Sequence, residues 1–163
     1  MPKRFTSLLM VFACGLLVGW LGSNASQPAP PSAQAQVPSR AISMVDKAYR
    51  MITEDGLFAF NAMDKDPGFY QDGLYLFVLS ADGENLYHSA DRTLVGQDFS
   101  GKRDVKNRPY GQRLIRDTAA QGVWHAYETG NTASGENQWK LTYARQTDRG
   151  HIIAAGIFAR APH

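Results

Sequence analysis

The stretch LYLFVLSADGENLYHSADRTLVGQDF, Leu74 to Phe99, decides the fold. Two hydrophobic runs, Leu74 to Ser80 and Asn85 to His88, flank the sequence Ala-Asp-Gly-Glu, in which Asp-Gly supplies the positive φ angles that a short hairpin turn requires. The stretch therefore predicts two antiparallel strands. The second strand ends in a histidine and leads into a polar loop, and we expect this loop to leave polar groups above one face of the sheet.

Before the hairpin, apolar residues recur at helical spacing from Ala41 onward. The apolar positions are Ile42, Val45, Tyr49 and Ile52. They predict an amphipathic helix that runs on, or resumes, through LFAFNAM until Pro67 and Gly68 end it. A helix with one apolar side needs a sheet to cover it.

After the hairpin, the sequence predicts a helix from about Pro109 to Gly122. Three further strands are expected, separated by segments rich in turn-forming residues. They are Val123 to Glu128, Gln138 to Gln146 and His151 to Ala159. The sequence therefore predicts an α+β fold, in which a long N-terminal helix packs on a five-stranded antiparallel sheet.

The N-terminal segment has the layout of an export signal. Lys3 and Arg4 precede an uncharged run of eighteen residues, 5–22, and Ala-Gln-Ala follows at Ala33 to Ala35. Residues 1–22 are therefore a signal peptide or a membrane anchor. Cleavage after Ala35 would release a periplasmic or secreted protein, whereas an uncleaved segment would anchor the chain to the inner membrane through residues 5–22.

The composition narrows the class of protein. Residues 23–40, rich in Pro, Ala, Ser and Gln, are expected to form a linker, and residues 41–160 a single domain. Beyond the leader, 15 basic residues face 15 acidic ones, so no basic surface for nucleic acid is expected. The four histidines lack metal-ligand spacing, and no Gly-x-Ser-x-Gly motif is present. We therefore expect no catalytic residue, no metal and no cofactor.

Four segments in order resemble the single Cache domain of the second type, an extracytoplasmic relative of PAS sensors. They are GLYLFVLSADGENLYHSADRTLVGQDF, GVWHAYE, QWKLTYARQ and IIAAGIF. The resemblance implies a PAS-like sheet that binds a small metabolite beneath residues 88–99, which form a lid with His88 at its hinge. The polar, glycine-containing lid is expected to be weakly held by the rest of the fold. Trp139 and Ser89 stand where the family often has proline, which bears on the identity of the ligand.

Strand alternation suggests which side chains share a face with the lid. Lys140 lies between apolar neighbours on a central strand, where its charge is costly unless it meets an anion or a carboxylate partner. Asp104 or Glu128 could be that partner, or the amine could reach solvent. The predicted ligand-binding residues are Tyr75, His88, Lys140 and Thr142, together with Trp124 or Tyr127, which lie on opposite faces of their strand. Small residues at Ala154 and Gly156 leave room on this face.

Two functions follow as hypotheses. In the first, the domain binds a small carboxylate, such as an organic or amino acid, and presents the bound state to a membrane receptor, sensor kinase or transporter. In the second, the chain is an accessory protein-docking module whose pocket is vestigial.

Overall fold

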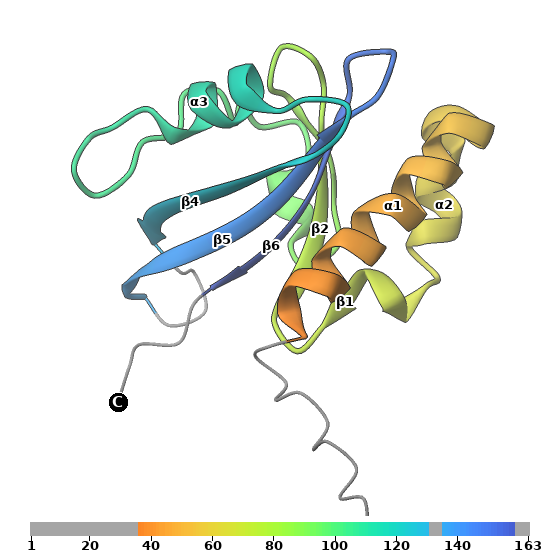
Figure 1. Cartoon of the computed structure of the whole chain (residues 1–163), viewed down its shortest axis with the longest axis horizontal. Helices are drawn as coiled ribbons and strands as arrows, with labels where there is room; N and C mark the ends of the chain where they lie inside the picture. The colour runs from red at the N-terminus through yellow and green to blue at the C-terminus, as the bar shows by residue number, and fades with distance from the viewer. Residues whose placement is uncertain (1–35, 131–134, 159–163) are drawn as a thin grey trace, which may run out of the picture. The chain divides into compact units, whose positions relative to one another are not determined.

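Helix α1 (Val37–Asp55) lies across one face of an antiparallel sheet in the computed structural model of the chain, which describes residues 36–130 and 135–158 (Figure 1). The helix begins four residues before the expected Ala41, because Pro38 lies in its first turn, where a proline needs no hydrogen-bond partner. The predicted leader and most of the predicted linker lie outside the described residues. Within the described part, no helix is long and apolar enough to span a membrane.

The chain after α1 forms short helical segments before it enters the sheet. They are the 3₁₀ turn η1 (Gly56–Phe58), the helix α2 (Ala59–Met63) and the 3₁₀ turn η2 (Pro67–Phe69). Gly56 ends α1 with a positive φ of 61°, so of the two predicted alternatives the helix resumes, as α2, and does not run on. Helix α2 ends at Met63, before the predicted stop, and Pro67 and Gly68 lie in η2, directly before the first strand.

In the part of the chain that the structure describes, the sheet contains six strands, one more than predicted. They are β1 (Tyr70–Gln71), β2 (Leu74–Leu79), β3 (Asn85–His88), β4 (Val123–Gly130), β5 (Asn137–Gln146) and β6 (Ile152–Phe158). The spatial order is β1-β2-β6-β5-β4, with β3 paired to β2, and every pairing is antiparallel. The additional strand β1 is only two residues long, and Asp72 and Gly73, both with positive φ, turn it into β2.

Helix α3 (Tyr110–Asp117) is shorter than the helix predicted to reach Gly122. It ends at Thr118, whose backbone is extended and whose hydroxyl donates to the Leu114 carbonyl at 2.6 Å. The Leu114 carbonyl therefore accepts two bonds from Thr118, since the Thr118 N–H also donates to it at 3.1 Å, and the chain leaves the helix at this residue. Gly122 instead adopts a positive φ just before β4, where a Cβ atom would collide with the Tyr143 hydroxyl.

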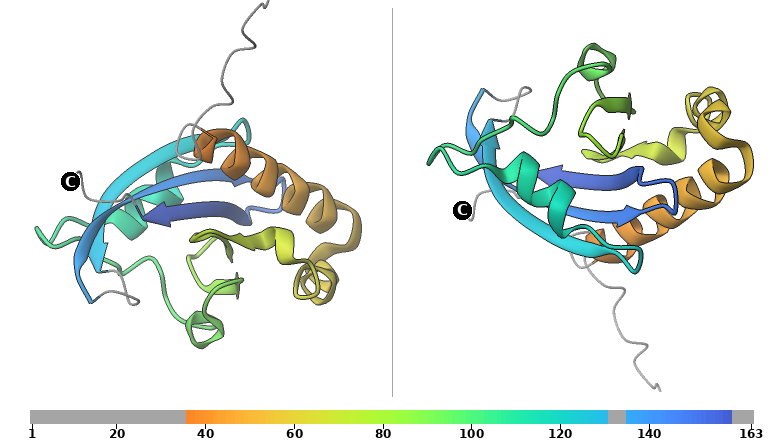
Figure 2. Two further views of the ribbon diagram at one scale, coloured as in Figure 1. Left: turned by 90° about the horizontal axis from the view of Figure 1, so that it is seen from below. Right: turned by 90° about the horizontal axis from the view of Figure 1, so that it is seen from above.

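The two faces of the sheet carry separate cores, as the alternation along the strands predicts. Leu74, Leu76 and Val78 of β2 pack beneath α1, together with Ile153 and Ala155 of β6. The opposite face carries a mainly aromatic and aliphatic cluster, made of Phe77, Leu79, Tyr110, Leu114, Tyr127, Ala144, Ile152 and Ala154. Figure 2 shows α1 on one side of the sheet and the segment after β3 on the other.

Candidate functional site

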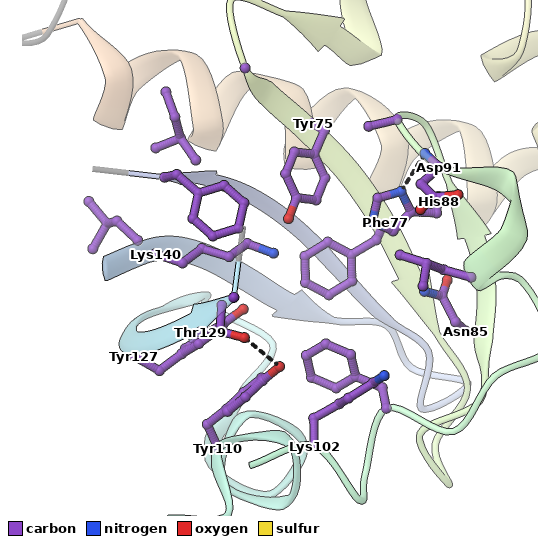
Figure 3. A pocket seen from close by; sticks show the side chains of 18 of the residues that line it. Tyr75, Phe77, Asn85, His88, Asp91, Lys102, Tyr110, Tyr127, Thr129 and Lys140 are labelled. Atoms are coloured by element: carbon purple, nitrogen blue, oxygen red, sulfur yellow. Dashed lines mark hydrogen bonds between the residues drawn. The ribbon is translucent and has the colours of Figure 1, made fainter. Parts of the chain in front are cut away.

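An open cleft of about 1520 Å³ lies mainly on the sheet face opposite α1, between the strands and the segment that follows β3 (Figure 3). It extends past the ends of β5 and β6 to the start of α1. Its walls include six aromatic side chains: Tyr75, Phe77, Phe99, Tyr110, Tyr127 and Phe158. Apolar walls with a few polar groups are typical of sites for small molecules.

Lys140 is the most unusual group in this cleft. It is 6% exposed, and its Nζ lies 4.4 Å from the ring centre of Tyr75 and 4.8 Å from that of Phe77. The side chain crosses Gly156 of β6, where a Cβ atom would collide with Lys140 Cε. Among the described residues, no carboxylate lies within 4.0 Å of Nζ. Burial therefore lowers the pKa of Lys140 to about 7.

The two carboxylates considered as partners for Lys140 are engaged elsewhere or lie on the wrong face. Asp104 pairs with the Arg108 side chain and accepts the backbone N–H groups of Lys106 and Arg108. Glu128 is opposite Trp139 in the β4–β5 ladder, so it shares the other face of the sheet. The pairing of Lys140 with Asp104 or Glu128 is therefore not formed, and the exit of its amine to solvent is ruled out by its burial.

His88 lies at the end of β3 beside the same aromatic rings. Its ring centre is 4.9 Å from that of Tyr75 and 6.1 Å from that of Phe77. The Asp91 backbone N–H donates to His88 Nδ1 at 2.9 Å, so a neutral His88 carries its proton on Nε2. Burial, and then the charge of Lys140, lower the pKa of His88 to about 4. His88 is therefore a neutral hydrogen-bond donor in the cleft at neutral pH.

The lid is held more firmly than the sequence suggests. The Gly96 N–H donates to the Asn85 carbonyl at 2.7 Å, and the Asn85 N–H donates to the Gln97 carbonyl at 2.9 Å. A third bond joins the Phe99 N–H to the Gly83 carbonyl at 2.8 Å. The second half of the lid is thus tied to the hairpin turn, and the expectation of a weakly held lid is wrong for residues 96–99. The first half contains the 3₁₀ turn η3 (Arg92–Leu94).

The structure also settles which side of β4 faces the cleft. Tyr127 lines it, and its hydroxyl lies 3.1 Å from Thr142 Oγ1. Thr142 was predicted to line the pocket, but it is fully buried behind Tyr127 and does not line the cleft. Its hydroxyl supports Tyr127 from behind. Trp124 lies on the other face, where its ring packs against Tyr143 at 5.1 Å, and it is no longer a candidate ligand contact.

Four of the six predicted residues therefore come together in the cleft: Tyr75, His88, Tyr127 and Lys140. Sequence reasoning missed Tyr110, which stacks on Tyr127 with ring centres 4.2 Å apart, and Asn85, which lines the cleft below the lid. The alternation of β2 could have added Phe77 to the prediction, because it shares a face with Tyr75. In the described part of the chain, no three side chains are grouped as a metal site requires.

Comparisons with known proteins give one family. The family model described as Single Cache domain 2 matches residues 40–158. The periplasmic sensor domain of a chemotaxis protein has a TM-score of 0.61 and 18% identity, with 80% of this chain and 100% of that chain covered. No curated protein sequence matches the chain.

Two further solved structures have the same fold. A Cache chemosensory domain described for carboxylic acid recognition has a TM-score of 0.58 and 16% identity, with 76% of this chain and 94% of that chain covered. A methyl-accepting chemotaxis protein from Vibrio parahaemolyticus RIMD 2210633 has a TM-score of 0.54 and 15% identity, covering 77% of this chain and 84% of its own.

Proposed function

Since the chain belongs to the Single Cache domain 2 family, we propose that it is an extracytoplasmic sensor domain that binds a small carboxylate without converting it. The observation that carries this proposal is the buried amine of Lys140, which has no carboxylate partner among the described residues and opens into a cleft. A buried cation without a partner is costly, and a bound carboxylate would supply the missing charge.

The other groups of the cleft suit the same ligand. The Nε2–H of neutral His88 can donate to a carboxylate oxygen, and the rings of Tyr75 and Phe77 can pack against the carbon skeleton. Each charge-assisted hydrogen bond contributes about 1.5–3 kcal/mol to binding. Support also comes from the structurally similar Cache domain whose description names carboxylic acid recognition.

A panel of small carboxylates, screened by thermal shift and measured by calorimetry, tests this proposal. We expect Lys140→Met, which keeps the length of the side chain and removes the amine, to weaken binding about tenfold or more. Lys106→Met, at an exposed position outside the cleft, is the matched control and should bind as the native protein does. Carboxylate binding that Lys140→Met retains at full strength would refute the assignment of Lys140.

The signalling step would use the lid. A ligand beneath it contacts His88 directly, so the first half of the lid, residues 88–95, can differ between free and bound states. We propose that this surface, in its ligand-bound form, is recognised by a membrane receptor, sensor kinase or transporter. Hydrogen exchange should show protection on ligand addition in residues 88–95, with less change in residues 96–99, which are tied to the hairpin turn by backbone hydrogen bonds. Uniform protection would argue against a switch.

A second candidate function is protein docking, and two tryptophans favour it. Trp124 and Trp139 are 37% and 50% exposed on the sheet face that also carries α1. Large exposed aromatic residues are enriched at protein interfaces. If this face serves as a docking surface, the double variant Trp124→Ala/Trp139→Ala should abolish capture of a membrane partner while carboxylate binding is unchanged.

A further inference from the structure

The amine of Lys140 is unpaired but can be reached from the cleft. Within the described residues its Nζ makes no hydrogen bond or ion pair, and the atom keeps surface that a molecule in the cleft can touch. The stem of the side chain rests against Gly156, which has no side chain to displace it. The amine is therefore held in a defined place, and Figure 3 shows it pointing toward the rings of Tyr75 and Phe77.

Aromatic rings surround this amine on several sides. Besides Tyr75 and Phe77, Nζ lies 5.8 Å from the ring centres of both Tyr127 and Phe158. Ring faces attract cations, but they do not replace the water shell that burial removes from an ammonium group. A neutral amine loses little by the same burial, so these surroundings favour the form that carries a free lone pair.

The titratable groups that face Lys140 from β2, β3 and β4 carry no charge at neutral pH. Burial raises the pKa of Tyr75 and that of Tyr127, so both hydroxyls stay protonated. His88 is neutral, because burial and then the charge of Lys140 lower its pKa to about 4. Burial alone lowers the pKa of Lys140 to about 7. About half of this amine is therefore neutral at pH 7, whereas exposed lysines are almost fully protonated.

The carboxylates elsewhere in the cleft do not reach the amine. Asp72, at the end near α1, pairs with Arg40 at 3.0 Å. Asp91 and Asp98 of the lid each accept a backbone N–H from two residues further along the chain. In the part of the chain that the structure describes, none of these carboxylates lies within 4.0 Å of Lys140 Nζ.

We infer that Lys140 is a nucleophile that captures a small apolar aldehyde from the cleft as a reversible imine. The lone pair of neutral Nζ attacks the carbonyl carbon, and the carbonyl oxygen takes up one proton from the nitrogen, which gives a carbinolamine. The new hydroxyl then leaves as water with the second proton of the nitrogen, and a C=N bond remains. The reaction needs no oxidant or reductant, and hydrolysis reverses it. Desolvated lysines are the ones that form imines with carbonyl compounds in enzymes.

The surroundings of the amine fit an aldehyde with a short carbon chain. The aromatic rings can pack against the chain, and an aldehyde brings no charge into the apolar part of the cleft. The hydroxyl of Tyr75, which points into the same space in Figure 3, can donate to the carbonyl oxygen. This inference goes beyond the proposed function, since the protonated amine would meet a carboxylate and the neutral amine an aldehyde.

Reductive trapping on the full chain tests the inference. Limiting propanal is added with sodium cyanoborohydride, which converts an imine into a stable propylamine, and the modified lysines are found by peptide mapping. At pH 7, Lys140 should be modified about tenfold or more faster than Lys65 and Lys106, which are exposed and serve as internal controls. Raising the pH should lower the ratio of Lys140 to Lys106 modification, because above about pH 8 only the exposed amine still gains much of its neutral form.

Calorimetry without reductant separates imine formation from simple fit. Propanal should bind the native protein about tenfold or more tightly than propan-1-ol, which has the same chain without the carbonyl, and Lys140→Met should lose this difference. Equal modification of Lys140 and Lys106, or a propanal preference that Lys140→Met retains, would overturn the inference. Propanoate, titrated in the same series, tests the proposed function by itself. Propanoate binding without trapping at Lys140 overturns the inference alone, and trapping without binding of any carboxylate overturns the proposed function alone.

Discussion

Removing the amine of Lys140 should change how stability depends on pH. The pKa of Lys140 is lowered from 10.5 to about 7 by burial, so the unfolded chain binds more protons than the folded one between these two values. The free energy of unfolding therefore rises with pH across this window, and the cost of the buried charge is fully present below about pH 7. Lys140→Met has no such group and should lack this rise.

The size of the effect follows from the pKa difference. One pKa unit corresponds to about 1.4 kcal/mol, so the full shift corresponds to roughly 5 kcal/mol of stability at low pH. Between about pH 7 and pH 9, the native protein should gain about 2–3 kcal/mol relative to Lys140→Met. At about pH 6 the variant should be the more stable of the two.

Urea denaturation at several pH values measures this difference directly. Subtracting the Lys140→Met curve from the native curve cancels the contributions of titrating groups that do not interact with Lys140. His88 does interact with Lys140, but its lowered pKa of about 4 keeps its own titration below pH 7. Lys106→Met, at an exposed position, should give a curve parallel to that of the native protein. If the curves of the native protein and Lys140→Met are also parallel, Lys140 keeps an ordinary pKa, and the argument from its burial fails.

Three further predictions concern the cleft. Because a carboxylate requires protonated Lys140, its affinity should fall by up to about tenfold per pH unit above pH 7, with proton uptake visible when calorimetry is repeated in buffers of different ionisation enthalpy. Gly156→Ala should push Lys140 from its place over β6, weaken carboxylate binding and cost about 1–3 kcal/mol of stability by urea denaturation. A Gly156→Ala protein with native affinity would show that the amine has another route into the cleft. Tyr127→Phe breaks the hydroxyl contact with Thr142 and should cost about 1 kcal/mol by the same measurement, without changing the pH dependence.

Local sequence patterns predicted most of the fold. The Asp-Gly turn and the two apolar runs give the β2–β3 hairpin, because turn geometry and alternation depend on neighbouring residues alone. Alternation also placed Tyr75 and Lys140 on the same face as each other. The end of α3 at Thr118 was missed, because the prediction relied on Gly122 as the stop, whereas the backbone is already extended at Thr118, whose hydroxyl bonds back to the Leu114 carbonyl.

The rest of the site depends on contacts that are distant in the sequence. The choice between Trp124 and Tyr127 is fixed by the register of β4 on β5, which period-2 alternation leaves open. In the β2–β3 ladder a bulge pairs Leu79 with Asn85 where regular pairing would give Leu86, and this puts Asn85 on the cleft face. The bulge depends on the pairing of β3 with β2 and with the lid, and no single residue of the hairpin marks it. The lid was expected to be loose because its composition is polar, but backbone hydrogen bonds are independent of that composition.

A single sheet separates the cleft from α1, so each strand contacts the cleft through one face and the helix side through the other. Along β6, Ala154 faces the aromatic cluster of the cleft side, while its neighbours Ile153 and Ala155 pack against the helix. A ligand that shifts this strand, or β5 beside it, would also shift the side chains that pack against α1. A displacement of β6 caused by a bound ligand would therefore reach α1 through direct packing contacts.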